Sequence, residues 1–309
     1  MSTADRTAVI LMAYGTPRTK EEILPYYTDI RRGRPPTPEL LQDLTDRYEA
    51  IGGLSPLKQL TEAQRDALQR ELEKIAPGGY HVTLGLKHAS PFIEEAVAEV
   101  AAAGFRRIVG IVLAPHFSSY SIGQYVGRVR DAAAPHGIEV RSVDSWATEP
   151  AFVDFLAADM KKKLAGMPER TKVLFTAHSL PQRIIDGGDP YPDELRATAE
   201  AVAGRVGLTR WSQWSIAWQS AGRTPEPWIG PDILEVIDSF GAQKSTEEPI
   251  DGVLVSACGF VADHLEVLYD LDIEASHRAA AHGLAFDRTS CVNDNENVMA
   301  ALARRVVSA

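Results

Sequence analysis

The apolar run TAVILMAYG, residues 7–15, is the first of the segments that decide the fold. It is rich in aliphatic residues and ends in glycine, so it predicts a β-strand that is buried on both faces. Runs of the same kind recur along the chain and alternate with longer helical patterns. They span residues 80–89, 106–115, 138–146, 172–180, 214–222, 251–260 and 283–291. This alternation predicts parallel sheets that are covered by helices on both faces.

The distribution of these runs predicts two domains. Four strands fall in each half of the chain, and a length of 309 residues suits two domains of about 150 residues each. The fold class that we expect is α/β, with two doubly wound, Rossmann-like domains that each contain a four-stranded parallel sheet. We place the first domain at residues 1–145 and the second at residues 146–309. The last helix can pack back on the first domain.

The composition excludes several classes of partner. A net charge of −10 and a pI near 5.3 argue against nucleic acid and anionic membranes. No apolar stretch approaches the roughly 20 residues that cross a bilayer, so we expect no integral membrane segment. The two cysteines, Cys258 and Cys291, indicate a reduced, cytoplasmic protein, although the sequence leaves a disulfide between them open. Two cysteines are also too few for a four-cysteine iron–sulfur cluster.

Chemically active side chains stand at the ends of several predicted strands. In doubly wound sheets, ligands bind beyond the carboxyl ends of the strands. The strand ends carry Tyr14, His88, His116, Trp146, His178, Gln219 and Ser220, and an acidic stretch follows residue 259. Two domains that face each other across this edge would form a cleft. The chain has no P-loop motif and no G-x-G-x-x-G after a strand, so nucleotide binding is unsupported.

The acidic stretch VADHLEVLYDLDIE, residues 261–274, concentrates charge of one sign. On a helix, Glu266, Asp270 and Glu274 have the spacing i, i+4 and i+8, so they stack on one face and repel one another. A solvated acidic helix face is one interpretation. Because the row begins at a strand end and carries only negative charge, we favour a divalent metal ion and its route into a site.

Five blocks of sequence resemble the ferrochelatase family. They are MAYGTP (12–17), RYEAIGGLSPL (47–57), TAHSLP (176–181), WQSAGRTPEPWIGPD (218–232) and GFVADHLEVLYDLDIE (259–274). The blocks stand in the order that the family has, and the resemblance runs from about residue 7 to the C-terminal helix. It implies the chelatase-like version of the two-domain fold. WQSAG and Tyr14 make the sequence most similar to the soluble, monomeric bacterial branch that acts on coproporphyrin III.

The resemblance implies an enzyme that inserts ferrous iron into coproporphyrin III, giving Fe-coproporphyrin III (coprohaem) in haem biosynthesis. Fe²⁺ is then a substrate, and we expect no tightly bound cofactor and no [2Fe–2S] cluster. Three alternatives stay open: iron insertion into protoporphyrin IX, a cobalt chelatase of tetrapyrrole metabolism, and a non-catalytic binder of haem or metal. Transient contact with neighbouring enzymes of the haem pathway is a further expectation.

His178 and Glu266 are the expected catalytic residues and the expected ligands of the incoming metal. A neutral imidazole accepts a proton near pH 7 and binds first-row divalent metals, so it suits both proton removal and metal delivery. His178 ends a predicted strand, where a core histidine is the plain alternative; the resemblance places it at the ring centre. It places Glu266 opposite or beside that imidazole. His264 lies two residues before Glu266, so on a helix it points elsewhere, and we expect it to orient its neighbours.

The resemblance also implies a set of porphyrin-binding residues. A flat apolar ring with four propionates requires charged donors at its rim and apolar walls around its centre. The family pattern assigns this role to Tyr14, Arg31, Arg47, Tyr48, Ser55 and Tyr125. Tyr14 would approach the iron from the face opposite His178. Arg31 stands in IRRGRPP, residues 30–36, which without the resemblance is a solvated basic loop.

A secondary divalent ion is expected near Arg47, Asp270 and Glu274, at the outer end of the acidic row. In the family, the corresponding helix is partly of the wide π type, which can shift the stacking of these carboxylates by a residue. Lys87 and His88, at another strand end, are expected near the mouth of the cleft.

Overall fold

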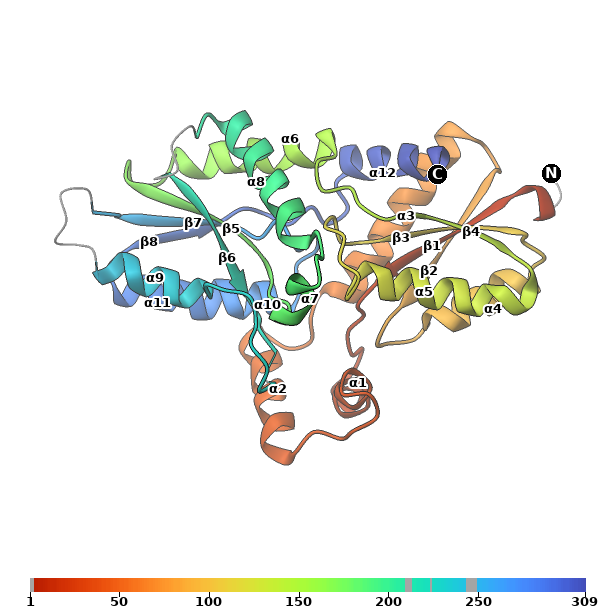
Figure 1. The fold of residues 1–309 in the computed structure, drawn as a ribbon, viewed down its shortest axis with the longest axis horizontal. Coiled ribbons are helices and arrows are strands. Elements are labelled where there is room, and N and C mark those ends of the chain that lie inside the picture. Colours follow the sequence, from red (N-terminus) through yellow and green to blue (C-terminus); the bar gives the residue numbers. More distant parts are fainter. Residues whose placement is uncertain (1–2, 209–212, 223, 243–248) are drawn as a thin grey trace.

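The strands form two parallel sheets, one in each half of the chain (Figure 1). The computed structural model describes residues 3–208, 213–222, 224–242 and 249–309. Within these residues the sheet orders are β2-β1-β3-β4 and β6-β5-β7-β8. The first sheet contains β1 (Thr7–Ala13), β2 (Tyr80–Leu86), β3 (Arg107–Val112) and β4 (Glu139–Val143). The second contains β5 (Thr171–His178), β6 (Trp214–Gln219), β7 (Gly252–Ser256) and β8 (Ala285–Arg288). The predicted fold class is confirmed.

Helices cover the sheets and connect their strands (Figure 1). The first half contains α1 (Ile23–Ile30), α2 (Pro38–Ala50), α3 (Leu57–Ile75), α4 (Ile93–Ala102) and α5 (Ile122–Ala133). The second contains α6 (Pro150–Leu164), α7 (Gln182–Asp186), α8 (Tyr191–Val206), α9 (Ile233–Ala242), α10 (Leu265–Leu268), α11 (Ser276–Ala281) and α12 (Glu296–Ser308). A π-helical segment, η4 (Asp270–Ala275), joins α10 to α11, and short 3₁₀ turns are η1 (Thr3–Asp5), η2 (Lys20–Glu22) and η3 (Ala134–His136). Of the helices in the described residues, none has both the length and the apolar character that crossing a membrane requires.

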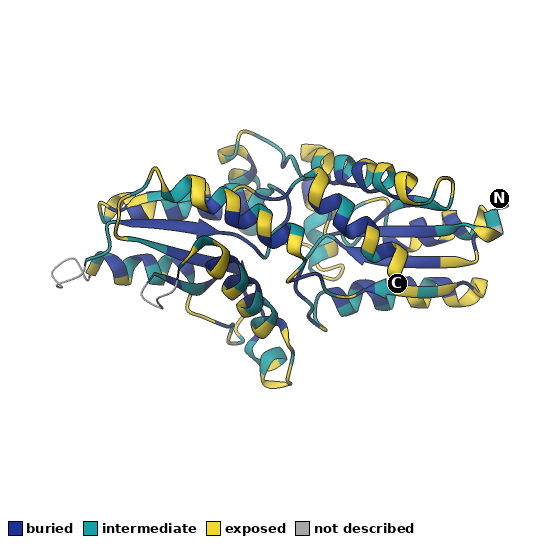
Figure 2. Ribbon diagram, turned by 90° about the horizontal axis from the view of Figure 1, so that it is seen from above, coloured by how far each residue is buried: buried dark blue, intermediate teal, exposed yellow. Residues whose placement is uncertain are grey.

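Strand β1 is the inner strand that its apolar sequence predicts. It pairs in parallel with β2 on one side and β3 on the other, and six of its seven residues are buried. Figure 2 shows the buried strands between helices whose outward faces are exposed. Burying an aliphatic side chain contributes about 1.5–3 kcal/mol. The hydrophobic effect therefore places this run at the centre of its sheet.

One apolar core extends through both halves of the chain. It includes Leu68 of α3, Phe175 of β5 and Leu302 of α12, all of which are fully buried. The C-terminal helix α12 packs against α3, so the end of the chain covers a helix of the first half (Figure 1). The two sheets are thus held together by shared packing. The domain boundary between residues 145 and 146 stays a prediction.

The two sheets direct their carboxyl ends toward the middle of the molecule (Figure 1). Helices α1 and α2 project from the first half beside this junction. Arg47 of α2 stacks on Tyr269, which follows α10, with 4.6 Å between the guanidinium carbon and the ring centre. Side chains from both halves therefore meet near the ends of the strands.

His116, one of the strand-end histidines, belongs to the core between the halves. It is 2% exposed, and its Nε2 lies 2.8 Å from Oγ1 of Thr198 on α8. Thr198 uses its hydroxyl proton on the carbonyl oxygen of Ala147, so Nε2 of His116 is the donor to Thr198. Nδ1 has no hydrogen-bond partner among the described residues. Burial lowers the pKa of His116 to about 3.

We expect His116 to make stability depend on pH. The unfolded histidine titrates near 6.5 and the folded one near 3, so the unfolded chain binds more protons between these values. Its contribution is present above pH 6.5 and is lost as the pH falls toward 3, by on the order of 3–5 kcal/mol. His116→Gln, whose amide can still donate to Thr198, should flatten this slope in denaturant unfolding from pH 7 to pH 4. His136→Gln, at an exposed histidine, is the control; equal slopes in the two variants would contradict the assignment.

Candidate functional site

His178 and Glu266 lie together at the carboxyl end of the second sheet. His178 is the last residue of β5 and Glu266 is on α10, and Nε2 of the imidazole is 3.9 Å from Oε1 of the carboxylate. Their side chains are 35% and 36% exposed, so both are reachable from solvent. Nδ1 of His178 is 2.5 Å from the carbonyl oxygen of Ser179, which can only accept, so Nδ1 carries the proton. The lone pair of the neutral ring is thus on Nε2, toward Glu266.

The carboxylate of Glu266 lies between two imidazoles. Its second oxygen is 3.7 Å from Nε2 of His264. Burial would raise the pKa of Glu266, but His178 and then His264, in their protonated forms, outweigh it and hold that pKa below its usual range. The expectation that His264 points elsewhere is wrong. His264 precedes α10 in extended conformation, with φ of −156°, so helical spacing does not govern its direction.

Gln219 holds the backbone of Glu266 and was not among the predicted site residues. It ends β6 beside His178 of β5, and it is 1% exposed. Its Nε2 donates to the carbonyl oxygen of Glu266 at 3.2 Å, and its Oε1 accepts from the Thr176 hydroxyl at 2.8 Å. Its position at a strand end was visible in the sequence, but its hydrogen bond to residue 266 was not.

The acidic row forms on a helix that is partly of the π type. The amide of Glu274 donates to the carbonyl oxygen of Tyr269 at 2.9 Å, five residues back, as the wide helix requires. Asp270 is buried and accepts from the Ser220 hydroxyl at 2.5 Å. Its other oxygen lies 3.4 Å from Nη1 of Arg47. Burial and the charges of Glu266 and Glu274 outweigh these partners and raise the pKa of Asp270 to about 7.

The three predicted tyrosines, Tyr14, Tyr48 and Tyr125, belong to the first half of the chain, and the charge of Glu266 acts on the first two. Tyr14 follows β1, is 42% exposed and stacks against His88 with 4.5 Å between ring centres. The surrounding protein and then Glu266 raise the pKa of Tyr14 well above its ordinary value, and Tyr125 and Tyr48 add to this effect. Burial and Glu266 raise the pKa of Tyr48 to about 12. Tyr14 and Tyr48 thus feel the charge of Glu266, and the porphyrin-binding roles of all three tyrosines stay predictions.

Arg31 and Ser55 form hydrogen bonds within their own segments. Arg31 follows α1, where Nε donates to the carbonyl oxygen of Arg34 at 3.3 Å. Ser55 is buried, and its hydroxyl accepts from the amide of Leu57 at the start of α3. Neither hydrogen bond involves the His178–Glu266 pair, so the porphyrin-binding roles of both residues stay predictions.

The next strand end of the first sheet carries Lys87 and His88. Nζ of Lys87 is 5.1 Å from the ring centre of Tyr125. Nδ1 of His88 is 2.6 Å from a carboxylate oxygen of Asp29. Burial, with Arg128 and Arg32 nearby, lowers the pKa of Lys87 to about 8. These side chains therefore border Tyr14 and Tyr125.

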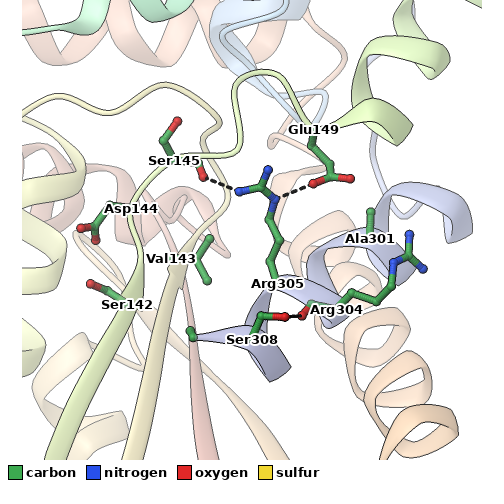
Figure 3. Close-up of a pocket in the computed structure, with 10 residues that line it drawn as sticks. Ser142, Val143, Asp144, Ser145, Glu149, Ala301, Arg304, Arg305 and Ser308 are labelled. Atoms are coloured by element: carbon green, nitrogen blue, oxygen red, sulfur yellow. Dashed lines mark hydrogen bonds and ion pairs between the residues drawn. The ribbon is translucent and has the colours of Figure 1, made fainter.

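Two pockets of the described residues lie away from the His178–Glu266 pair. One, of about 500 Å³, lies between α12 and the segment that follows β4, where Arg305 bridges Glu149 and the carbonyl oxygen of Ser145 (Figure 3). The other, of about 370 Å³, includes Glu274 and His277. No cluster of three or more His, Cys, Asp or Glu side chains in the described part of the chain could hold a metal ion. The cleft expected around His178 stays a prediction.

The sequence matches the family model described as Ferrochelatase over residues 6–309. The chain belongs to the ferrochelatase family. It is therefore an enzyme of the metal chelatase type, for which iron is a substrate. The resemblance inferred from the five sequence blocks is confirmed. Arg223, in the fourth block, lies outside the residues that the structure describes.

Relatives in this ferrochelatase family are similar over nearly their whole length. The chain is 43% identical to "Coproporphyrin III ferrochelatase" of Halalkalibacterium halodurans, covering 97% of this chain and 96% of the relative. It is also 43% identical to the protein of the same name from Bacillus subtilis, covering 98% and 97%. A protein named "Ferrochelatase" from Herpetosiphon aurantiacus is 41% identical, with 94% of each chain covered.

Solved structures of chelatases show the same fold. SirB from Bacillus subtilis with Fe³⁺ has a TM-score of 0.56 at 13% identity, covering 98% of this chain and 95% of that chain. CbiX, described as the terminal enzyme for biosynthesis of siroheme in denitrifying bacteria, has a TM-score of 0.53 at 13% identity, covering 98% and 99%. At this identity the likeness establishes the chelatase fold alone.

Replacing Gln219 should destabilise this ferrochelatase around Glu266. Gln219→Met keeps the volume but leaves the Thr176 hydroxyl without an acceptor and the Glu266 carbonyl without a donor. We expect a loss of about 1–3 kcal/mol in the free energy of unfolding, measured with denaturant. Gln42→Met, which removes a bond on an exposed helix face, should cost far less. Equal losses in the two variants would contradict a supporting role.

Proposed function

We propose that the chain inserts ferrous iron into coproporphyrin III, giving Fe-coproporphyrin III (coprohaem) in haem biosynthesis. The observation that carries the proposal is the imidazole of His178 with its unprotonated nitrogen 3.9 Å from the carboxylate of Glu266, both open to solvent. The choice of porphyrin rests on relatives named coproporphyrin III ferrochelatases that are 43% identical over 97–98% of the chain.

The His178–Glu266 pair provides the chemistry that porphyrin metallation requires. The reaction removes two pyrrole protons and replaces the water around Fe²⁺ with ring nitrogens. Nε2 of His178 can accept a proton or bind the ion, since Nδ1 is held in the protonated form by Ser179. The pKa of Glu266 is below its usual range, so Glu266 is ionised at neutral pH. Its carboxylate can therefore also accept a proton or bind the ion. Two protein ligands suffice for a substrate ion, because the ring supplies the remaining ligands.

The porphyrin is proposed to lie among residues from both halves of the chain. Tyr14 would face the iron opposite His178, as the resemblance implies, and its exposed side chain is open to a ligand. Tyr48 and Tyr125 would form walls of the site. Arg31, Arg47 and Ser55 are the proposed donors to the propionates at the rim, where guanidinium groups suit carboxylates.

The proposal extends to a secondary divalent ion near Arg47, Asp270 and Glu274. Asp270 already pairs with Arg47 and Ser220, so an ion there would compete with both partners. The chain's two cysteines cannot supply four thiolates, so we propose no [2Fe–2S] cluster. The sparse cysteines also favour the cytoplasm. A monomeric state and transient contacts with other haem-pathway enzymes remain predictions.

A turnover assay with two porphyrins tests the substrate. Anaerobic mixing of the protein with Fe²⁺ and either coproporphyrin III or protoporphyrin IX, followed by absorbance, should give faster turnover on coproporphyrin III. Faster turnover on protoporphyrin IX, or Co²⁺ insertion in preference to Fe²⁺, would favour the corresponding alternative. A stoichiometric complex without turnover would indicate a binding protein.

Removing either member of the pair should abolish turnover and leave the fold intact. We expect His178→Ala and Glu266→Gln each to lower kcat by roughly 10²-fold or more, the range for general acid–base residues. Both side chains are partly exposed, so circular dichroism and the unfolding midpoint should change little. His136→Ala and Glu139→Gln, at exposed positions, are the matched controls. Near-wild-type rates in both site variants would remove the proposed roles.

The rim arginine Arg31 should affect substrate binding more than chemistry. If it holds a propionate, Arg31→Met should raise KM for coproporphyrin III roughly tenfold and leave kcat within about threefold. The effect should be smaller for protoporphyrin IX, which has fewer carboxylates. Arg141→Met, on the exposed side of β4, serves as the control. Unchanged KM values for both porphyrins would place Arg31 outside the rim.

A further inference from the structure

One guanidinium connects two points that flank Glu266 in the sequence. Arg288 ends β8, at the edge of the second sheet (Figure 1), and its side chain is 15% exposed. Nη2 lies 3.0 Å from Oδ1 of Asp263. Nε lies 2.6 Å from Oδ1 of Asp272, and Nη2 lies 2.9 Å from Oδ2 of the same carboxylate. The guanidinium group of Arg288 therefore makes two hydrogen bonds to Asp272 and an ion pair with Asp263.

Asp263 is fixed from a second direction as well. Its amide donates to Oδ1 of Asn293 at 3.0 Å, and Nδ2 of Asn293 donates back to Oδ2 of Asp263 at 2.9 Å. Asp263 immediately precedes His264, the extended residue at the start of α10. Arg288, the last residue of β8, and Asn293, which follows that strand, together hold Asp263 in place.

Asp272 lies on the π-helical segment η4, which needs support from outside itself. A π turn is rarer and less favourable than an α turn. The carboxylates of Glu266 and Glu274 also act on Asp270, whose pKa is raised by burial first and by these two charges in addition. A fixed cation bound to Asp272 opposes the unwinding that this repulsion favours.

We propose that Arg288 is a positioning residue for metal insertion: it clamps the segment from Asp263 to Asp272 at both ends. Glu266, inside the clamped segment, is thereby kept against His178. Arg288 contacts neither substrate nor reacting atoms in this role. The inference rests on the proposed function, and it deepens that function by naming what orients the carboxylate.

Three variants test the clamp in the full-length protein with Fe²⁺ and coproporphyrin III. Arg288→Met removes the charge and keeps the apolar stem, and we expect kcat to fall at least tenfold while KM for the porphyrin changes less than twofold. Arg288→Lys restores the positive charge but not the paired hydrogen bonds to Asp272, so it should recover part of kcat. Asp272→Asn breaks the η4 end alone at a partly exposed site and should give a smaller fall of the same kind. Arg170→Met, which removes an exposed pair with Asp251, is the control.

Amide hydrogen exchange gives a readout that does not depend on turnover. In Arg288→Met, exchange should accelerate within residues 263–275 and stay unchanged in β5, because the clamp is local. A kcat within twofold of wild type would overturn the proposal, as would faster exchange across the whole second half, which indicates general destabilisation. If the wild-type protein turns over neither porphyrin, the proposed function itself fails, and the positioning role fails with it.

Discussion

The carboxylate of Glu266 between the imidazoles of His178 and His264 is the interaction on which the site depends. Both rings lie within 4 Å of this carboxylate and, in their protonated forms, hold its pKa below the usual range against the effect of partial burial. Ser179 fixes the tautomer of His178, so the basic nitrogen faces the carboxylate rather than the backbone. The same pair can therefore receive a cation or protons without rearranging.

Placing a carboxylate there requires the protein to hold a helix rich in acidic side chains in position. Gln219 binds the carbonyl oxygen of Glu266, and Ser220 binds Asp270 from the neighbouring position, with a left-handed φ of 58°. Arg47 reaches Asp270 from the other half of the chain. Polar contacts from the end of β6 and from α2 thus support α10 and the π-helical segment that follows it, in keeping with the frequent occurrence of π turns at functional sites.

The two halves must also keep a fixed position relative to each other, because the proposed porphyrin contacts come from both. Tyr14, Tyr48 and Tyr125 belong to the first half, while His178 and Glu266 belong to the second. A shared apolar core, the packing of α12 on α3 and the buried bond from His116 to Thr198 hold the halves together. The solved chelatase structures share this two-sheet fold.

The sequence by itself determined the fold class and the members of the central pair. Runs such as residues 7–15 predict buried parallel strands because apolar period and length are local properties, and the family blocks carry His178 and Glu266. Only the tertiary structure decided that His264 turns toward Glu266, that Gln219 supports it and that His116 is a core residue. It also decided that Arg288 joins Asp263 to Asp272. These contacts connect residues that are distant in sequence or lie where a helix begins, and no periodicity in the chain specifies them.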